Sequence, residues 1–405
     1  MGKNSTTIIA GAGVAGLTAA LLIANRGFHV TLLEKSSSID RSGVGIQLSP
    51  NATHVLAELG LLEKLEAASI APKNIVIKKG STGNILSTFP LENIMLERYG
   101  APYLVLHRAD LANLLFDACK VHPHIDVQFN RQIEDVAMHA NGVTVMALNC
   151  NTQDTGGKHG QTSEYLGAAL IGADGGHSKI RTGIVGGEPA TPSGDIAWRA
   201  LIDIEKTPKS ISKMDTTLWM GKSGHIVCYP IRKSRFLNIV AITPSSSATE
   251  IARGRCKTDG AALFKFFAKW DTDIVQLLKS TAEWHGWPLN QVEPKGNWVK
   301  GATVLIGDAA HAMLPYAAQG GAAAIEDAVM LAKSIGADRE DLPSAFIDYE
   351  KKRKPRATQI WQLARTNRKI YHMGGVAAVV RNIVLGNTSS DQLYKRFEWL
   401  YGWKC

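Results

Sequence analysis

A glycine motif near the start of the chain constrains the fold more than any other feature. Residues 11–16 read G-A-G-V-A-G, after a short apolar run, Thr6–Ala10, and before a segment rich in Ala and Leu, residues 14–26. A second apolar run, residues 29–34, comes next. A strand, a glycine turn, a helix and a second strand within about 30 residues form a βαβ unit. This order predicts a parallel sheet that binds a dinucleotide at the N-terminus of its first helix.

Each glycine of the motif has its own expected role. Gly11 permits the tight turn, Gly13 lets the backbone approach a pyrophosphate, and Gly16 lets the helix pack closely on the strand. The helix N-terminus offers unpaired N–H groups and a positive dipole end to the phosphates. Glu34, which closes the second strand, would accept hydrogen bonds from a ribose.

Two later motifs distinguish between NAD and FAD. Residues 172–181 read G-A-D-G-G-H-S-K-I-R and follow a predicted strand, and residues 307–311 read G-D-A-A-H after the apolar strand 302–306. Asp308 is therefore expected at the carboxyl edge of the sheet, where open α/β sheets bind ligands. A carboxylate there is a poor partner for a phosphate but a good acceptor for a polyol hydroxyl. Because flavins contain a ribityl chain and NAD does not, Asp308 favours FAD.

The middle of the chain has a different pattern. Short strand-like segments separated by turn residues occupy 196–204, 216–220, 225–231 and 236–242. Their spacing predicts an antiparallel sheet. A helix is expected over 260–278, and the chain from about residue 322 onward is expected to be mostly helical.

The predicted fold class is therefore α/β, with a Rossmann-like FAD-binding domain, an inserted antiparallel-sheet substrate domain and a helical C-terminus. The predicted boundaries are 1–75, 100–185 and 290–350 for a discontinuous FAD-binding domain, 76–99 and 186–289 for the substrate domain, and 351–405 for the C-terminal helices.

The chain resembles the FAD-dependent aromatic monooxygenases, the single-component flavoprotein hydroxylases. In that family G-x-G-x-x-G, D-G-x-x-S-x-x-R and G-D-A-A-H-x-x-x-P occur in this order, as they do here. Segments 45–52 (G-I-Q-L-S-P-N-A), 107–111 (H-R-A-D-L) and 307–327 resemble the salicylate and 6-hydroxynicotinate hydroxylases in particular, and so does the tail at 399–402. The resemblance covers nearly the whole chain.

The resemblance implies a reaction. FAD would be bound non-covalently, and NADH or NADPH would reduce it and leave, since the chain has no second dinucleotide fingerprint. Reduced flavin would capture O₂ as a C4a-hydroperoxide that hydroxylates an aromatic ring, such as a hydroxybenzoate or a hydroxypyridine carboxylate. Two alternatives stay open: a flavin-dependent epoxidase or hydroxylase of a non-aromatic or antibiotic substrate, and a non-catalytic, redox-regulatory flavoprotein.

The resemblance also implies roles for cofactor-binding residues. Arg108 would contact the FAD backbone; the alternative is an exposed salt-bridge residue. Asp174 would lie near the cofactor or the path of the reductant, or would cap a helix. The helix that opens at Gly320 would stabilise negative charge on the reduced flavin. The predicted cofactor site comprises Gly11, Gly13, Ala15, Gly16, Glu34, Lys35, Gln47, Arg108, Asp174, Asp308, Gly320 and Gly321.

His225 and Tyr229 are the predicted catalytic residues. Side chains alternate along a strand, so His225 and Tyr229 would point to one face of segment 225–231. Histidine is well suited to accept a phenolic proton near neutral pH, and the resembling subgroup often has His and Tyr four residues apart here. The alternative is a half-buried sheet face with ordinary polar groups. Gln47 stands where some relatives carry a histidine, and His311 is expected to make only a structural hydrogen bond.

Composition limits the other possibilities. The 405 residues carry a net charge of +9, which suits an anionic substrate, but no nucleic-acid module is recognisable. The densest basic run, residues 351–356, is interpreted as a solvated helix face. Five scattered cysteines suggest neither a metal site nor disulfides, and so favour the cytoplasm. No apolar run is long enough for a membrane span. The expected partners are a small aromatic substrate and O₂, with the protein a monomer or a homodimer.

Overall fold

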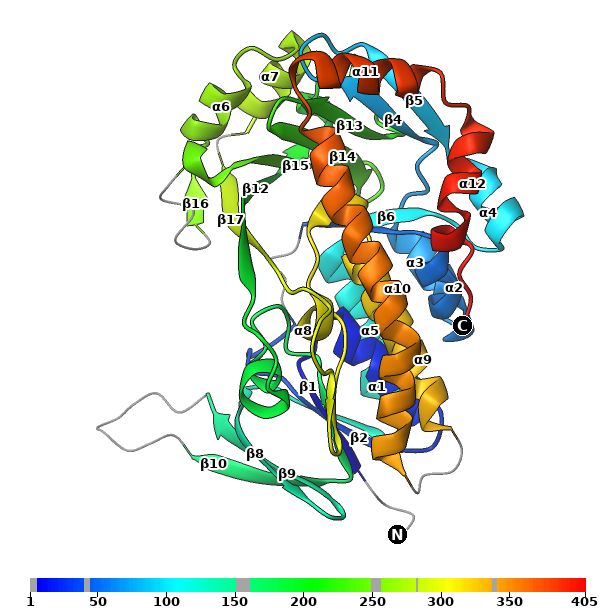
Figure 1. Ribbon diagram of the computed structural model, residues 1–405, viewed down its shortest axis with the longest axis vertical. Helices are drawn as coiled ribbons and strands as arrows, with labels where there is room; N and C mark the ends of the chain where they lie inside the picture. Colours follow the sequence, from blue (N-terminus) through cyan, green and yellow to red (C-terminus); the bar gives the residue numbers. More distant parts are fainter. Residues whose placement is uncertain (1–5, 40–43, 151–160, 249–255, 282, 337–340) are drawn as a thin grey trace.

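A six-stranded sheet forms one end of the molecule, the lower end in Figure 1. The computed structural model describes residues 6–39, 44–150, 161–248, 256–281, 283–336 and 341–405. Neighbouring strands of this sheet are parallel except β18 and β19. Its order is β18 (Val299–Lys300), β19 (Thr303–Leu305), β11 (Ala169–Gly172), β1 (Thr6–Ala10), β2 (His29–Leu33) and β7 (Ile125–Gln128).

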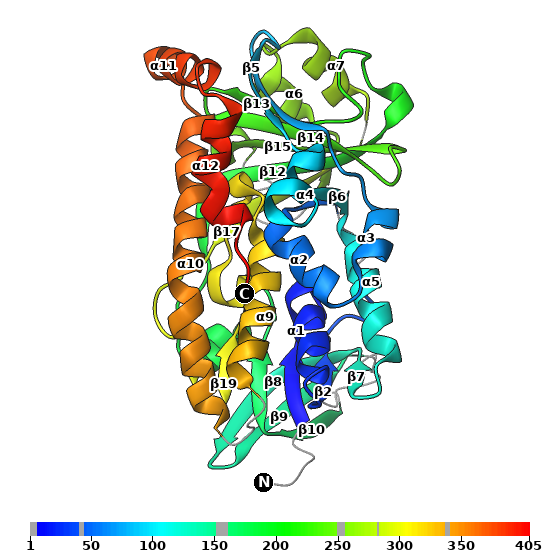
Figure 2. The ribbon, with the colours of Figure 1, turned by 90° about the vertical axis from the view of Figure 1, so that its right-hand side faces the viewer.

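The predicted βαβ unit is present at the centre of this sheet. Helix α1 (Val14–Ala24) joins β1 to β2 and is buried along its whole length. It packs against α5 (Arg108–Val121) and α9 (Gly320–Ile335), as Figure 2 shows. Because α1 is covered on several sides, it is apolar all round rather than along a single stripe.

A three-stranded antiparallel sheet lies beside the six-stranded sheet (Figure 1). Its strands are β8 (Arg131–His139), β9 (Gly142–Asn149) and β10 (Thr162–Gly167). Val143, Val145 and Ala147 of β9 are buried in the same core as β1. Residues 151–160, between β9 and β10, lie outside the described part of the chain.

An eight-stranded sheet forms the other end of the molecule. The expected antiparallel sheet is confirmed with one exception, because β13 pairs with β4 in parallel. Strand β4 comes from a distant part of the chain, so its direction was not constrained by a hairpin. The order is β16 (Cys256–Thr258), β17 (Trp284–Gln291), β12 (Thr191–Asp203), β15 (Phe236–Pro244), β14 (Gly224–Ile231), β13 (Thr216–Gly221), β4 (Asn74–Lys79) and β5 (Ile85–Pro90).

The prediction of a single helix over 260–278 is wrong. Two helices occur instead, α6 (Ala261–Phe267) and α7 (Thr272–Lys279). Between them, the Trp270 ring packs so closely on Gly80 and Gly221 that a Cβ at either glycine would lie 2.5 Å from it. Asp271 then caps α7 by accepting a hydrogen bond from the backbone N–H of Asp273. Tertiary packing and a new N-cap therefore end the first helix.

Long helices connect the two ends. Helix α10 (Leu342–Tyr371) runs from beside the six-stranded sheet to the eight-stranded sheet (Figures 1 and 2). Strands β3 (Gly45–Leu48) and β6 (Leu104–His107) form a small ladder between the two sheets. The remaining helices are α2 (Pro50–Glu58), α3 (Leu62–Ala68), α4 (Glu92–Tyr99), α8 (Asp308–His311), α11 (Gly375–Gly386) and α12 (Ser390–Tyr401). None of the helices in the described residues is long and apolar enough to span a membrane. The domain boundaries given above stay a prediction.

Candidate active site

The first of three cavities lies at the carboxyl ends of β1 and β2. It has a volume of about 290 Å³, and Gly11, Gly13, Glu34, Lys35 and Asp174 are among its lining residues. The carboxylate of Glu34 accepts hydrogen bonds from the backbone N–H groups of Ala12 and Ser36, both at 2.8 Å. These bonds fix the carboxylate beside the glycine turn, where a ribose hydroxyl could reach it.

The glycine turn has the geometry that a bound pyrophosphate requires. Gly11 has a φ of +100°, which side chains rarely adopt. A Cβ at Gly16 would lie 2.0 Å from the carbonyl oxygen of Gly11, so helix and turn pack too closely for any side chain. A Cβ at Gly13, by contrast, would meet no atom within 4 Å. The space beside Gly13 is therefore open on the cavity side, as expected for a phosphate cradle.

Asp174 fits both of its predicted roles. One carboxylate oxygen accepts a hydrogen bond from the backbone N–H of Ile180 at 3.3 Å, near the start of the following helical turn. The other, Oδ1, is buried and makes no hydrogen bond in the described structure. Since a buried carboxylate oxygen without a partner is costly, this atom is suited to accept a hydrogen bond from a ligand in the cavity.

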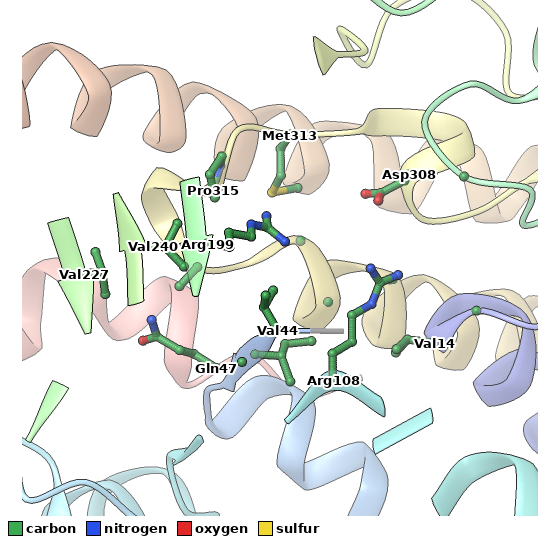
Figure 3. Close-up of a pocket in the computed structure, with 18 of the residues that line it drawn as sticks. Val14, Val44, Gln47, Arg108, Arg199, Val227, Val240, Asp308, Met313 and Pro315 are labelled. Carbon is green, nitrogen blue, oxygen red and sulfur yellow. The ribbon is translucent and has the colours of Figure 1, made fainter. Parts of the chain in front are cut away.

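A second cavity of about 310 Å³ continues from the first toward the eight-stranded sheet. The two share Gly13, Ala173 and Gly175, so they form one slot. Figure 3 shows Arg108 and Asp308 pointing into this space. Within the described residues no ion pair holds Arg108, which is exposed to the slot. Ala15, Gln47, Gly320 and Gly321 also line the second cavity.

The predicted cofactor-binding residues are arranged along this slot. Glu34 lies at one end, Gly13 lies where the two cavities meet, and Asp308 lies on the first turn of α8. The end of the slot nearer the eight-stranded sheet is called the flavin end, after the prediction for Gly320. Helix α9 begins at Gly320 and directs its N-terminus into the flavin end. The predicted site residues are thus brought together along one slot, apart from Gly16, which packs behind it.

A buried ionic cluster supports the flavin end of the slot. Asp327 of α9 accepts hydrogen bonds from the backbone N–H of Gly307 at 2.7 Å, from His311 Nε2 at 2.5 Å and from Arg353 Nε at 2.8 Å. Burial alone would raise the pKa of Asp327, but His311, Arg353 and these bonds outweigh it and lower the pKa. His311 therefore makes the structural hydrogen bond predicted from the sequence, and the cluster fixes the turn that carries Asp308.

The interpretation of residues 351–356 as a solvated helix face needs correction. Lys351 and Lys352 are exposed, but Arg353 is fully buried, and Arg356 is largely buried. Both arginines bind the buried carboxylate of Glu326, at 2.7 and 2.6 Å. The sequence signal for this arrangement was the Glu-Asp pair at 326–327, which interrupts a run of small and apolar residues from Gly320 to Ala332.

The same cluster extends to the first turn of α2, which follows β3. The Asn51 amide donates to Glu326 at 2.6 Å and to Gln319 at 3.1 Å, and Gln319 donates to Ser49 at 2.9 Å. Segment 45–52 is thereby tied to the residue before α9. Both segments, 45–52 and 307–327, carry the resemblance noted in the sequence, but that resemblance did not indicate that they bond to each other.

The third cavity, of about 140 Å³, adjoins the flavin end. It shares five lining residues with the second cavity, Gln47, His225, Val227, Pro315 and Ala318. Its other walls are mainly aromatic and aliphatic, including Tyr103, Phe89, Tyr371, Phe397 and Tyr401. A planar ring in this cavity would lie next to whatever occupies the flavin end.

His225 and Tyr229 lie on the same face of β14 and both line the second cavity. His225 is only 2% exposed, and burial, together with the neighbouring His372, lowers its pKa well below the usual 6.5. Its ring is therefore neutral at pH 7, with one ring nitrogen that carries no proton. Tyr229 is also buried, which raises its pKa and keeps its phenol neutral. The Tyr229 ring packs directly on Gly45. A Cβ placed at Gly45 would lie 2.5 Å from Cε2 of Tyr229, so a larger residue would displace the ring.

Several residues at these cavities were not predicted from the sequence. Arg199 and Met313 line the second cavity (Figure 3), and Tyr316 lines the third. Nδ1 of His225 lies 2.9 Å from Nε2 of His372, at the end of α10. Arg199 and His372 come from segments without a recognisable motif, whereas Met313 occupies an unspecified position of G-D-A-A-H-x-x-x-P and Tyr316 follows that motif. Only the fold brings these residues together.

The fold and the slot together define a flavoprotein that binds FAD. The chain belongs to the family described as "FAD binding domain", which matches residues 4–364. It is an FAD-dependent monooxygenase. The resemblance noted in the sequence, the α/β fold class and the FAD cofactor are thus confirmed.

Its relatives include hydroxylases of aromatic acids. The chain is 33% identical over 400 residues to 3-hydroxybenzoate 6-hydroxylase 1 of Aquipseudomonas alcaligenes, covering 98% of each chain. It is 28% identical to 6-hydroxynicotinate 3-monooxygenase of Pseudomonas fluorescens, covering 91% of this chain and 92% of the relative.

Solved structures share the fold. A salicylate hydroxylase substrate complex superimposes with a TM-score of 0.81 at 21% identity, covering 99% of this chain and 96% of the other. Klebsiella pneumoniae HpxO, complexed with FAD and uric acid, gives a TM-score of 0.79 at 22% identity, covering 97% of this chain and 95% of the other.

Proposed function

We propose that the protein uses NADH or NADPH and O₂ to hydroxylate a phenolic aromatic acid, of the hydroxybenzoate or hydroxypyridine carboxylate class. The single observation that carries this proposal is the aromatic-walled cavity that adjoins the FAD slot and has a neutral histidine, His225, in the shared wall. The relatives that act on 3-hydroxybenzoate and 6-hydroxynicotinate support the substrate class.

The residues of the slot would hold and orient FAD. Glu34 would bind the adenosine ribose, the open backbone at Gly13 the pyrophosphate, and Asp308 the ribityl hydroxyls. Arg108 would lie along the cofactor backbone. When bound, FAD supplies the electron transfer and the activation of O₂. The N-terminus of α9 at Gly320 would stabilise negative charge on the reduced ring.

His225 would remove the proton from the ring hydroxyl of the substrate. A phenolate is much more electron-rich than a phenol, and so reacts faster with an electrophilic oxygen. His225 is neutral and lines both the flavin end and the ring cavity, so its imidazole can act as the general base. Tyr229 would donate a hydrogen bond to the substrate at the pocket edge. Arg199, which lines the same space, would attract a ring carboxylate.

The test is a screen of NADH and NADPH consumption by the purified holoenzyme, with hydroxybenzoates and hydroxypyridine carboxylates supplied under ¹⁸O₂. We expect at least one compound to accelerate consumption many-fold and to gain one ¹⁸O atom on its ring. If some of these compounds accelerate NADH or NADPH consumption but none of them gains a hydroxyl group on its ring, the proposal is contradicted. If only non-aromatic substrates were oxygenated, the epoxidase alternative would replace it; if nothing were oxygenated, a redox-regulatory role would.

A variant tests the role of His225 separately. His225→Ala should lower the hydroxylation rate by about 10²–10⁴-fold, the usual scale for removing a general base. It should leave FAD bound, because the residues that hold FAD are different ones. The share of NADH oxidised to peroxide without product should also rise. Unchanged rate and unchanged coupling would refute the assignment.

A further inference from the structure

A buried base can work repeatedly only if its proton can leave. His225 is 2% exposed and is enclosed by the rings of Tyr316, Tyr371 and His372, with centroids 5.0–5.3 Å away. Within the described residues, its one hydrogen bond is the 2.9 Å contact between its Nδ1 and Nε2 of His372. His372 is partly exposed, so the two imidazoles form a connected path from the cavity to the surface.

We propose that His372 is a proton-relay residue that acts through His225 and links the substrate cavity to solvent. This inference rests on the proposed function, because it assumes that a phenol is ionised in the cavity. In the arrangement suited to a base, Nδ1–H of His225 donates to Nε2 of His372, which leaves the lone pair of His225 Nε2 for the substrate. Both nitrogens of an imidazole can carry protons, so the pair can transfer a proton without moving.

The proton transfers balance for the ionisation and reprotonation of the phenolic oxygen; the ring proton displaced by hydroxylation does not use this path. The phenolic O–H bond breaks and its proton bonds to Nε2 of His225. The Nδ1 proton of His225 passes to Nε2 of His372, which releases its Nδ1 proton to water. When the hydroxylated product regains a proton on its phenolate oxygen, the same path runs in reverse and restores both tautomers. No oxidant or reductant takes part in these steps.

The surroundings suit a residue that carries a proton briefly. His372 follows the last residue of the 30-residue helix α10, whose C-terminal dipole favours a positive imidazolium. The Asp195 carboxylate also favours a positive charge on His372. That carboxylate is, however, already paired with Arg368 at 2.5 and 2.8 Å and with the Tyr316 hydroxyl at 2.5 Å. Burial and Arg368, opposed by Asp195, lower the pKa of His372 to about 4. A proton on His372 would therefore pass quickly to water.

The experiment follows ring ionisation without turnover. Oxidised holoenzyme is mixed rapidly at pH 7, without NADH, with 3-hydroxybenzoate as the first probe, and the absorbance band of the phenolate is recorded. His372→Asn should slow its appearance by about 10²-fold, at the lower end for an acid–base group, and added imidazole should restore the rate. The control is His139→Asn, because His139 is an exposed histidine at the end of β8. This control should match the wild type.

A second probe separates a relay from a merely structural role. A fluorinated hydroxybenzoate that is already ionised at pH 7 needs no deprotonation, so His372→Asn should hydroxylate it at the wild-type rate. An unchanged ionisation rate in His372→Asn would overturn the relay while leaving the proposed function intact. Slow hydroxylation of the pre-ionised probe, or no rescue by imidazole, would show that His372 only positions His225, and would also overturn it. A wild-type enzyme that hydroxylates no phenol would refute the proposed function itself, and the relay with it.

Discussion

Two glycines of the nucleotide turn should fail in opposite ways when changed to alanine. At Gly16 the new Cβ would lie 2.0 Å from the backbone carbonyl oxygen of Gly11. No side-chain rotation can separate these two atoms, because a Cβ is fixed to its own backbone. Relief requires α1 to move away from the turn, which costs about 3 kcal/mol, at the upper end for overpacking. Gly16→Ala should therefore lower the unfolding temperature of the FAD-free protein.

Gly13→Ala should weaken FAD binding without destabilising the apoprotein. Gly13 has a φ of −79°, which alanine adopts readily, and its Cβ would meet no protein atom within 4 Å. Loss of a flexible residue could even stabilise the apoprotein by about 0.4–1 kcal/mol. The methyl group would, however, occupy the space for the pyrophosphate. A clash of about 1–3 kcal/mol would weaken FAD binding by about 5- to 150-fold.

The assay is thermal unfolding of the FAD-free proteins, followed by FAD titration monitored through flavin fluorescence. Gly183→Ala serves as the control, because Gly183 is exposed, has no positive φ and has open space around its Cβ position. That variant should leave FAD affinity unchanged and should not lower the unfolding temperature, since losing a flexible residue there can only stabilise the apoprotein slightly. Wild-type FAD affinity in Gly13→Ala would refute the phosphate cradle, and wild-type stability in Gly16→Ala would refute the packing argument.

Three further predictions concern other parts of the site. Arg353→Met should reduce the free energy of unfolding by about 3–5 kcal/mol, because it leaves the buried carboxylates of Glu326 and Asp327 with too little positive charge; an unchanged urea midpoint would contradict this. Asp308→Ala should weaken FAD retention by about 1–3 kcal/mol, measured by dialysis, without altering apoprotein stability, since Asp308 is exposed. The pKa of His372 falls from 6.5 to about 4 on folding, so its contribution to stability is complete above pH 6.5 and is lost as the pH falls toward 4, by at most about 3 kcal/mol. His372→Asn should therefore flatten that part of the curve of unfolding free energy against pH. A variant curve parallel to that of the wild type would contradict the assignment.

Local patterns were sufficient to predict the FAD slot. The glycine turn, Glu34 and Asp308 each follow a strand, and the carboxyl ends of parallel strands meet at one edge of a sheet. Alternation along β14 likewise predicted that His225 and Tyr229 would share a face. These inferences needed only the order of elements and the period of each one.

The contacts between distant segments were beyond local patterns. The partners of Arg353 are about 26 residues away, and His372 is 147 residues from His225. A basic run on an amphipathic helix is usually solvated, and nothing within 351–356 distinguishes the buried arginines from the exposed lysines. In the same way, the break between α6 and α7 depends on Trp270 packing on glycines from two other segments.

The central claim is that a phenol binds beside FAD with its hydroxyl on His225. The most direct test is a crystal structure of the holoenzyme with the best substrate from the NADH screen. We expect the flavin ring between Gly320 and β14, and the substrate hydroxyl about 2.6–3.2 Å from Nε2 of His225, the usual reach of a general base. A substrate bound elsewhere, or His225 and Tyr229 turned away from the flavin, would contradict the account.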